Sequence, residues 1–102
     1  MAQPASKSES TWQAVSAKEY ENKVRDLGCI LCQHLGLGKT PASIHHVESI
    51  RDELSAYAII PLCYDHHQGA NGVHGLHRRA FEMRYKLKDI DMLARGAREL
   101  NK

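Results

Sequence analysis

The chain lacks any apolar run approaching the roughly 20 residues that a helix needs to cross a bilayer, so a membrane-spanning role is excluded. It also lacks a positively charged start followed by an apolar stretch, which argues against a secretory signal peptide. Cysteine is scarce, and the three present cannot all pair within one chain. We therefore expect reduced thiols and a soluble protein inside the cell.

Charge of one sign is not in large excess either. The 14 lysines and arginines and the 12 acidic residues leave a net charge of +2, which is compatible with a nucleic-acid partner but does not demonstrate one. Several basic residues nevertheless gather in one segment: Arg78, Arg79, Arg84, Lys86 and Lys88. This basic run predicts positive potential beside the histidines that precede it, although a solvated helix face would look the same.

The length of 102 residues allows one small domain with a modest apolar core. Residues 1–15 are mostly small and polar, with few apolar groups to offset the entropy of ordering them, so we expect a flexible N-terminal tail there. Residues 16–102 are expected to form the folded domain. A domain of this size benefits from a cross-link, and a bound metal ion can supply one.

Local signals predict a helix followed by two short strands. The helix begins at Ser16, where Ser16 and Glu19 have the spacing of a capping box, and it ends at Gly28. Residues 43–47 and 57–62 are rich in β-branched or apolar side chains, and a polar stretch separates them. These two segments predict a β-hairpin with a long loop.

The spacing of apolar residues predicts two more helices in the C-terminal third. The first should turn four residues toward the core: Leu76, Ala80, Met83 and Leu87. The second, capped by Asp89, should do the same with Ile90, Leu93, Ala97 and Leu100. The segment between Cys32 and Pro41 contains two glycines, so we expect an irregular loop there.

Four residues form two half-sites with one spacing. Cys29-x-x-Cys32 and Cys63-x-x-His66 each place two ligands where the backbone can fold around one ion. Together they supply three thiolates and one imidazole, a closed tetrahedral set typical of structural zinc. A redox pair or packed core cysteines would leave the second half-site unexplained. The pattern therefore predicts a zinc ion that ties the end of the first helix to the segment after the hairpin.

Two histidine doublets, His45-His46 and His66-His67, indicate a second metal centre. Consecutive strand side chains face opposite ways, so His45 and His46 are not expected to bind the same ion. Consecutive helical positions differ by about 100°, so His66 can face the zinc while His67 serves a second site. His74 lies close downstream. An open set of imidazoles leaves room for water and a phosphate oxygen, as a catalytic ion requires.

These motifs resemble a known family. The doublet in His45-His46-Val47 is followed by Ile60-Pro61-Leu62-Cys63-x-x-His66-His67-Gln68-Gly69, then by Gly72-Val73-His74 and Phe81-Glu82-x-x-Tyr85. Such a series is similar to that of the HNH, or ββα-metal, nucleases. More narrowly, it resembles the Ref-type phage recombination-enhancement nucleases, which depend on RecA. The resemblance covers about residues 16–100.

The resemblance implies an α+β fold in which a β-hairpin packs on a helix, with a structural zinc site and flanking helices, so that residues 16–102 form a zinc-stapled HNH nuclease domain. It implies that His45, His67 and His74 bind the catalytic ion and that His46 is the general base. The implied activity is cleavage of DNA phosphodiesters with magnesium or manganese, leaving 5′-phosphates. The implied setting is phage or prophage recombination in the cytoplasm of a bacterial host, with DNA and a RecA filament as partners.

The chain departs from the general HNH pattern at its middle letter. The asparagine found five residues before the zinc cysteine in that pattern is replaced by Ala58. That asparagine usually orients the base, so another residue would have to hold His46, with Ser55 and Tyr57 as candidates.

Two further questions stay open at this point. The glycine-rich segment after the second doublet leaves the third ligand of the catalytic ion open between His74 and Asn71. The function is open as well, because a zinc-stapled DNA-binding module without catalysis, or a protein that only docks on a partner, would share the zinc half-sites. The open histidine set favours the nuclease, since a pure binding module would not require it.

Overall fold

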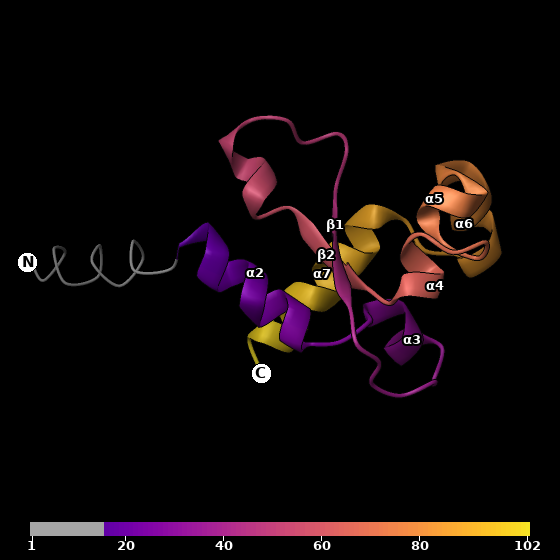
Figure 1. Cartoon of the computed structure of the whole chain (residues 1–102), viewed down its shortest axis with the longest axis horizontal. Helices are drawn as coiled ribbons and strands as arrows, with labels where there is room; N and C mark the ends of the chain where they lie inside the picture. Colours follow the sequence, from indigo (N-terminus) through magenta and orange to yellow (C-terminus); the bar gives the residue numbers. More distant parts are fainter. Residues whose placement is uncertain (1–15) are drawn as a thin grey trace, which may run out of the picture.

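The computed structural model describes residues 16–102, so the tail expected at residues 1–15 lies outside the described part. The fold is α+β, as predicted, with a two-stranded hairpin among helices (Figure 1). No helix of the described part combines the length and the hydrophobicity that crossing a membrane requires. In chain order, the elements are α2 (Ala17–Asp26), α3 (Ile30–His34), β1 (Ser43–His46), η1 (Glu53–Ala56), β2 (Ile59–Leu62), α4 (Tyr64–His67), α5 (Val73–Leu76), α6 (Arg78–Tyr85) and α7 (Asp89–Leu100).

The hairpin is antiparallel, with Ser43 opposite Leu62 and His46 opposite Ile59. Both strands lie within the segments that the sequence predicts. Every residue of β2 is buried, whereas β1 alternates toward its end, with His45 buried and His46 exposed. Each strand of a two-stranded sheet is an edge, so β2 tolerates Pro61, which has no amide hydrogen to donate.

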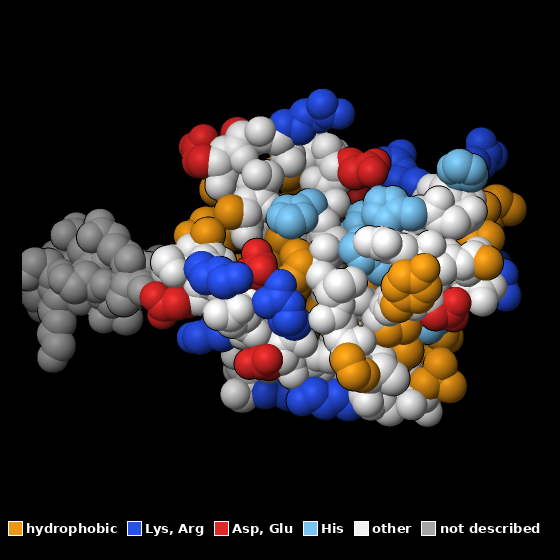
Figure 2. All heavy atoms as spheres, viewed as in Figure 1, with side chains coloured by type: hydrophobic (Ala, Val, Ile, Leu, Met, Phe, Trp, Pro, Cys, Tyr) orange, Lys and Arg blue, Asp and Glu red, His pale blue; other side chains and the backbone are white. Residues whose placement is uncertain are grey.

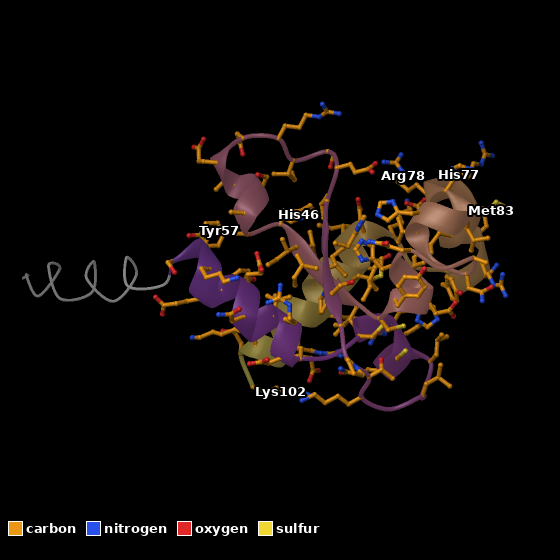
Figure 3. The ribbon with its side chains drawn as sticks, viewed as in Figure 1. His46, Tyr57, His77, Arg78, Met83 and Lys102 are labelled. Atoms are coloured by element: carbon orange, nitrogen blue, oxygen red, sulfur yellow. The ribbon has the colours of Figure 1, made fainter. Side chains whose placement is uncertain are left out.

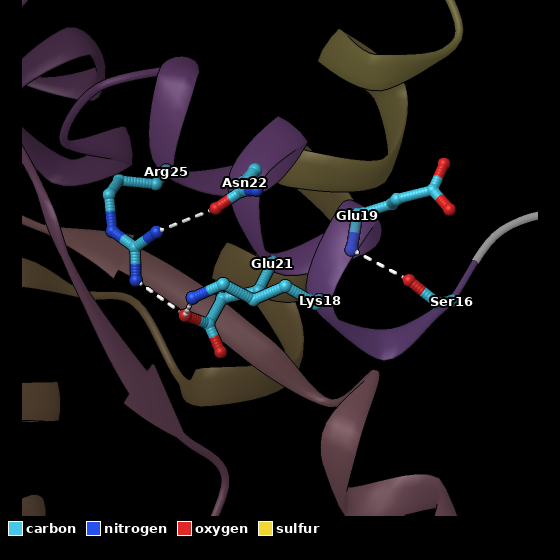
Figure 4. A network of polar contacts seen from close by, with 6 residues as sticks. All are labelled: Ser16, Lys18, Glu19, Glu21, Asn22 and Arg25. Atoms are coloured by element: carbon cyan, nitrogen blue, oxygen red, sulfur yellow. Dashed lines mark hydrogen bonds and ion pairs between the residues drawn. The ribbon is translucent and has the colours of Figure 1, made fainter.

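The first described helix, α2, begins where the sequence predicts. The Glu19 amide donates to Ser16 Oγ at 3.1 Å, which is the first bond of the expected capping box (Figure 4). After the helix, Gly28 adopts φ +80°, and a Cβ there would lie 2.9 Å from the Thr40 carbonyl oxygen. The Cys29 amide donates to that same oxygen at 3.0 Å. Glycine thus permits the close approach that holds Cys29 at the start of α3.

The core lies between the hairpin and the helices that pack on it. In Figure 1, α7 runs behind the hairpin, and α2 and α3 lie on either side of the chain that enters β1. Both α2 and α3 contact β2, as does α7. The buried cluster consists of Cys29, Ile30, Leu31, Cys32, Val47, Ile60, Leu62, Phe81, Leu87 and Met92. Two of the cysteines expected to bind zinc are therefore part of the core.

The core stripe predicted for the helix after residue 75 is wrong at Ala80 and Met83, which are exposed, but Leu76 packs against the core as expected. The chain has φ +68° at His77 and φ +59° at Lys86, so one continuous helix does not form across the segment. In α6, which lies between these two residues, Phe81 is 2% exposed while Met83 is 65% exposed. Leu87 is buried as expected, but it lies beyond the helix. The two positive φ angles rotate the helix relative to the face that regular spacing would predict.

The predicted stripe of α7 is wrong at Ile90 and Ala97, which are exposed, but Leu93 packs against the core as expected. Met92 and Gly96 are the buried residues of this helix, whereas Ile90 is 61% exposed. Asp89 is the first residue of the helix and not its cap; instead the Asp91 carboxylate accepts the Lys88 amide at 2.8 Å. The core selects the face carrying Met92, because that face meets β2.

A short helix replaces the start of the loop expected after Cys32. The Cys32 amide donates to Cys29 Sγ at 3.3 Å, and the Gln33 amide donates to the Cys29 carbonyl at 3.2 Å. The Gln33 side chain also donates to the Leu27 carbonyl at 2.6 Å. Because of these bonds, the first cysteine motif forms the start of α3. The irregular loop with positive φ at its glycines begins only at Gly36.

Candidate functional site

The four residues of the two half-sites meet in one cluster. Cys29 precedes α3, Cys32 lies within it, Cys63 precedes α4 and His66 lies on α4. The sulfurs of Cys32 and Cys63 are 3.7 Å apart, and the His66 Nδ1 lies 3.7, 3.5 and 3.3 Å from the sulfurs of Cys29, Cys32 and Cys63. A tetrahedral zinc ion bound at about 2.3 Å by sulfur and about 2.0 Å by nitrogen separates its ligand atoms by roughly 3.5–3.8 Å. The four side chains therefore lie close enough to bind one metal ion, and their spacing and donor chemistry fit zinc.

Burial favours the uncharged forms of two side chains of this cluster. Burial raises the pKa of the Cys29 thiol to about 12, because an unpaired thiolate is unfavourable away from water. Burial also lowers the pKa of His66. The ring of Tyr85 lies edge-on to His66, with centroids 5.5 Å apart and planes at 81°. A metal ion would supply the positive charge that buried thiolates need.

Three histidines form a second cluster. One ring nitrogen from each of His45, His67 and His74 can be chosen so that all three lie within 4.8 Å of one another. The ring centroids are 5.3 Å apart for His45 and His67, 5.4 Å for His45 and His74, and 4.9 Å for His67 and His74. His45 and His67 are each 6% exposed, and His74 is exposed. We call this set the histidine triad.

Burial favours the uncharged state of two triad members. It lowers the pKa of His45 to about 4, with smaller contributions from the neighbouring imidazoles of His67 and His74. Burial also lowers the pKa of His67, with smaller contributions from His74 and His46. A neutral imidazole keeps a lone pair on one ring nitrogen, so His45 and His67 can bind a cation at neutral pH.

Local backbone geometry brings the triad together. His45 points inward because strand side chains alternate. His67 follows His66 on α4 with a rotation of about 100°, so His66 faces the cysteine cluster and His67 faces the triad. The α4 helix contacts β1 and α5. Between α4 and α5 the chain doubles back tightly, since a Cβ on Gly72 would lie 2.5 Å from the His66 carbonyl carbon. This close turn carries His74 back over His67.

The other candidate for the third ligand lies elsewhere. The Asn71 side chain points to the Asp65 carboxylate, with its amide 3.4 and 3.5 Å from the two oxygens. The Asn71 carbonyl accepts the Tyr85 hydroxyl at 2.8 Å. Its amide group is thus occupied in bracing the turn, and the structure groups His74 with the triad instead.

His46 does not belong to the triad. It is exposed and lies on the opposite face of β1 from His45, toward α2 and η1, far from His77 and Arg78 at the other end of the molecule (Figure 3). The Glu21 carboxylate on α2 accepts Arg25 at 2.6 Å, and that bond lowers the pKa of Glu21, with a smaller contribution from His46 (Figure 4). Exposed histidine side chains accordingly appear in separate places on the face drawn in Figure 2.

Neither expected substitute for the HNH asparagine contacts His46 by a hydrogen bond among the described residues. The Ser55 amide donates to the Asp52 carbonyl at 2.9 Å, and the Tyr57 ring packs on Tyr20 with centroids 5.4 Å apart. Ala58 lies beside His46 in the hairpin, because its carbonyl accepts the Val47 amide at 2.9 Å. The role of Ser55 or Tyr57 in orienting the His46 ring stays a prediction.

A cavity of about 170 Å³ opens beside the triad, with His45 and His74 in its wall. Sequence reasoning missed three carboxylates that line it, because they come from three separate segments and share no motif: Glu48, Glu82 and Asp89. The basic run is divided by the fold. Arg78 lines this cavity, whereas the Arg84 guanidinium lies 5.8 Å from the centre of the Tyr85 ring.

Comparison with known proteins gives one match. The family model described as "Recombination enhancement, RecA-dependent nuclease" matches residues 13–100, which is most of the chain. No curated protein and no solved structure matches. The matched span contains both side-chain clusters and agrees with the resemblance carried by the sequence motifs. The chain therefore belongs to the family of RecA-dependent, recombination-enhancement nucleases.

Proposed function

We propose that this protein is a metal-dependent DNA endonuclease of the HNH type that acts in phage or prophage recombination. The observation that carries the proposal is the histidine triad, a set of imidazoles from the hairpin, α4 and α5 that lies beside an open cavity. A closed zinc cluster lies one residue away on α4, so anchoring and chemistry are assigned to different side chains. Membership in a nuclease family supports the same conclusion.

The donor set fits a catalytic cation. His45, His67 and His74 would hold it through three nitrogens and leave the remaining positions to water and phosphate oxygens. When bound, a magnesium or manganese ion would polarise the scissile phosphate and stabilise charge on the departing oxygen. Magnesium prefers oxygen ligands, so the nitrogen-rich set gives a reason to compare several divalent ions.

We assign the general base to His46. An in-line displacement at phosphorus needs the attacking water and the leaving oxygen on opposite sides. His46 lies outside the triad, so its ring is not used as a ligand and is left to act as the base. His46 is exposed, so its ring can reach a water molecule and accept its proton.

DNA would be held through its phosphates by basic residues near the histidine triad. Arg78 lines the cavity beside the triad, and its side chain is 72% exposed. Contacts of this kind depend on salt and carry little sequence information. The family description suggests that a RecA filament presents the DNA substrate.

A plasmid-nicking assay tests this function. Purified protein that retains zinc is incubated with supercoiled plasmid and magnesium or manganese, with and without RecA filaments. Nicking that requires the added ion supports the endonuclease. Absence of nicking under every condition, together with salt-sensitive DNA binding, would instead support a DNA-binding module without catalysis, a possibility raised by Ala58 in place of the HNH asparagine.

A further inference from the structure

Ser43 makes two polar contacts, one to the backbone of Leu62 and one to His67 of the histidine triad. Its hydroxyl donates to the Leu62 carbonyl at 3.2 Å, and its Oγ lies 2.7 Å from the His67 Nδ1. Ser43 and His45 are two residues apart on β1, so they share the strand face that α4 covers. One strand thus contributes both a triad member and a contact to a second member.

The proton count on these atoms assigns their roles. A serine hydroxyl carries one hydrogen, and the bond to the Leu62 carbonyl uses it. With its hydrogen on the Leu62 carbonyl, the Oγ accepts from the His67 Nδ1, which places the hydrogen of the neutral ring on Nδ1; a hydroxyl that donated to His67 at 2.7 Å would require the other tautomer. The lone pair of this tautomer lies on Nε2, which remains available to a cation.

We propose that Ser43 is a positioning residue, which locks the His67 ring in the Nδ1-protonated tautomer and presents its Nε2 to the catalytic ion. The inference rests on the proposed function for the identity of the site, but its geometry comes from the two hydrogen bonds alone. Metal-binding histidines commonly donate their second ring hydrogen to such a partner, and the partner sets both tautomer and ring orientation. A serine that only joined the two strands would need the Leu62 bond and not the contact to His67.

The direct test is nuclear magnetic resonance of the full chain labelled with ¹⁵N at histidine, with zinc retained and no catalytic ion added. Nitrogen shifts and long-range couplings tell a protonated ring nitrogen from one with a lone pair. We expect the His67 Nδ1 to be protonated in the wild type and the two tautomers to mix in Ser43→Ala. A wild-type His67 protonated at Nε2 would overturn the proposal.

Metal affinity supplies a second readout, measured by calorimetry with manganese as the probe. Removal of a partner of this kind weakens metal binding by about 10–100-fold, and we expect Ser43→Ala to do so. Ser43→Thr keeps the hydroxyl on a strand that accepts β-branched residues, so it should restore both affinity and tautomer. Ser55→Ala, at a serine remote from the triad, is the matched control. Equal affinity in Ser43→Ala and the wild type would overturn the assignment.

These measurements separate the inference from the proposed function. The tautomer of His67 is measured without DNA. A His67 protonated at Nδ1, in a protein that nicks no plasmid, would therefore support the role of Ser43 and contradict the nuclease mechanism. If Ser43→Ala fails to fold, the wild-type tautomer and the Ser43→Thr affinity still decide the question.

Discussion

His66 and His67 are adjacent on α4 but belong to different clusters. The His66 Nδ1 lies 3.3 Å from Cys63 Sγ, whereas the His67 Nδ1 lies 2.7 Å from Ser43 Oγ. A single helical step thus separates the cluster that fits structural zinc from the triad proposed for catalysis. Any change that rotates α4 should disturb both, so variants that affect only one cluster are the informative ones.

Zinc removal should unfold the protein. Two ligand cysteines are core residues, and apparent zinc-binding free energies of about 10–16 kcal/mol in small zinc domains exceed the stability of most domains of this size. We expect Cys63→Ser, or treatment with a strong chelator, to abolish the helical circular dichroism signal. His74→Ala, which alters only the exposed member of the triad, should keep both the signal and stoichiometric zinc. A chelated protein with an unchanged melting curve would contradict the structural role.

His46→Ala should lower the nicking rate without affecting the triad. Loss of a general base commonly costs about 10²–10⁴-fold in rate, while His46 lies outside the metal-binding cluster. Manganese affinity should therefore equal that of the wild type. His34→Ala is a matched control, since His34 is an exposed histidine outside both clusters. If His46→Ala nicks plasmid at the wild-type rate, another group must activate the water.

The His45 pKa predicts a specific pH dependence of stability. The folded protein holds this pKa at about 4, below the ordinary value of 6.5, so the unfolded chain binds a proton there more readily. Lowering the pH from 6.5 toward 4 should then favour unfolding, by up to about 3 kcal/mol from this group. Above pH 6.5 the group should have no effect.

Urea unfolding of zinc-loaded protein across this range provides the measurement. The zinc ligands also titrate as the pH falls, so the wild type is compared with His45→Gln, in which they are unchanged. We expect the variant to lose less stability between pH 6.5 and 4 than the wild type. His34→Gln should follow the wild-type curve, because His34 is exposed. Parallel curves of stability against pH for His45→Gln and the wild type would show that burial does not shift the pKa of His45.

Two glycine substitutions should have opposite effects. A Cβ at Gly72 would lie 2.5 Å from the His66 carbonyl carbon, so Gly72→Ala must push α5 away from α4. We expect lower stability and weaker manganese binding. In Gly96→Ala nothing lies within 4 Å of the new Cβ, and the helix α7 should gain about 0.5–1 kcal/mol. Melting temperatures and manganese calorimetry of both variants test the pair, and a stabilising Gly72→Ala would contradict the tight turn.

Several features of the site follow from local sequence because backbone periodicity alone decides them. The Ser16 cap, the two half-sites around Cys29 and Cys63, and the division of His66 from His67 all depend on residues a few positions apart. Side-chain directions at such short range follow from helix and strand geometry. The strand positions were predicted on the same basis and are confirmed.

Other features needed the folded chain. The core faces of α6 and α7 were predicted wrongly in part. Positive φ angles at His77 and Lys86 interrupt the regular spacing around α6, and the face of α7 that carries Met92 is the one that packs on the core. The presence of His74 rather than Asn71 in the triad depends on a tight turn between helices. The carboxylates of the cavity come from segments with no common motif.

The sequence by itself determined the chemistry of this protein, since the thiols and imidazoles and their short spacings are local properties. Only the tertiary structure decided which ring completes the triad and that the Ser43 hydroxyl on β1 reaches His67 on α4. Those relationships join residues far apart along the chain. They arise from the packing of α4, α5 and the hairpin on one core, which no local pattern encodes.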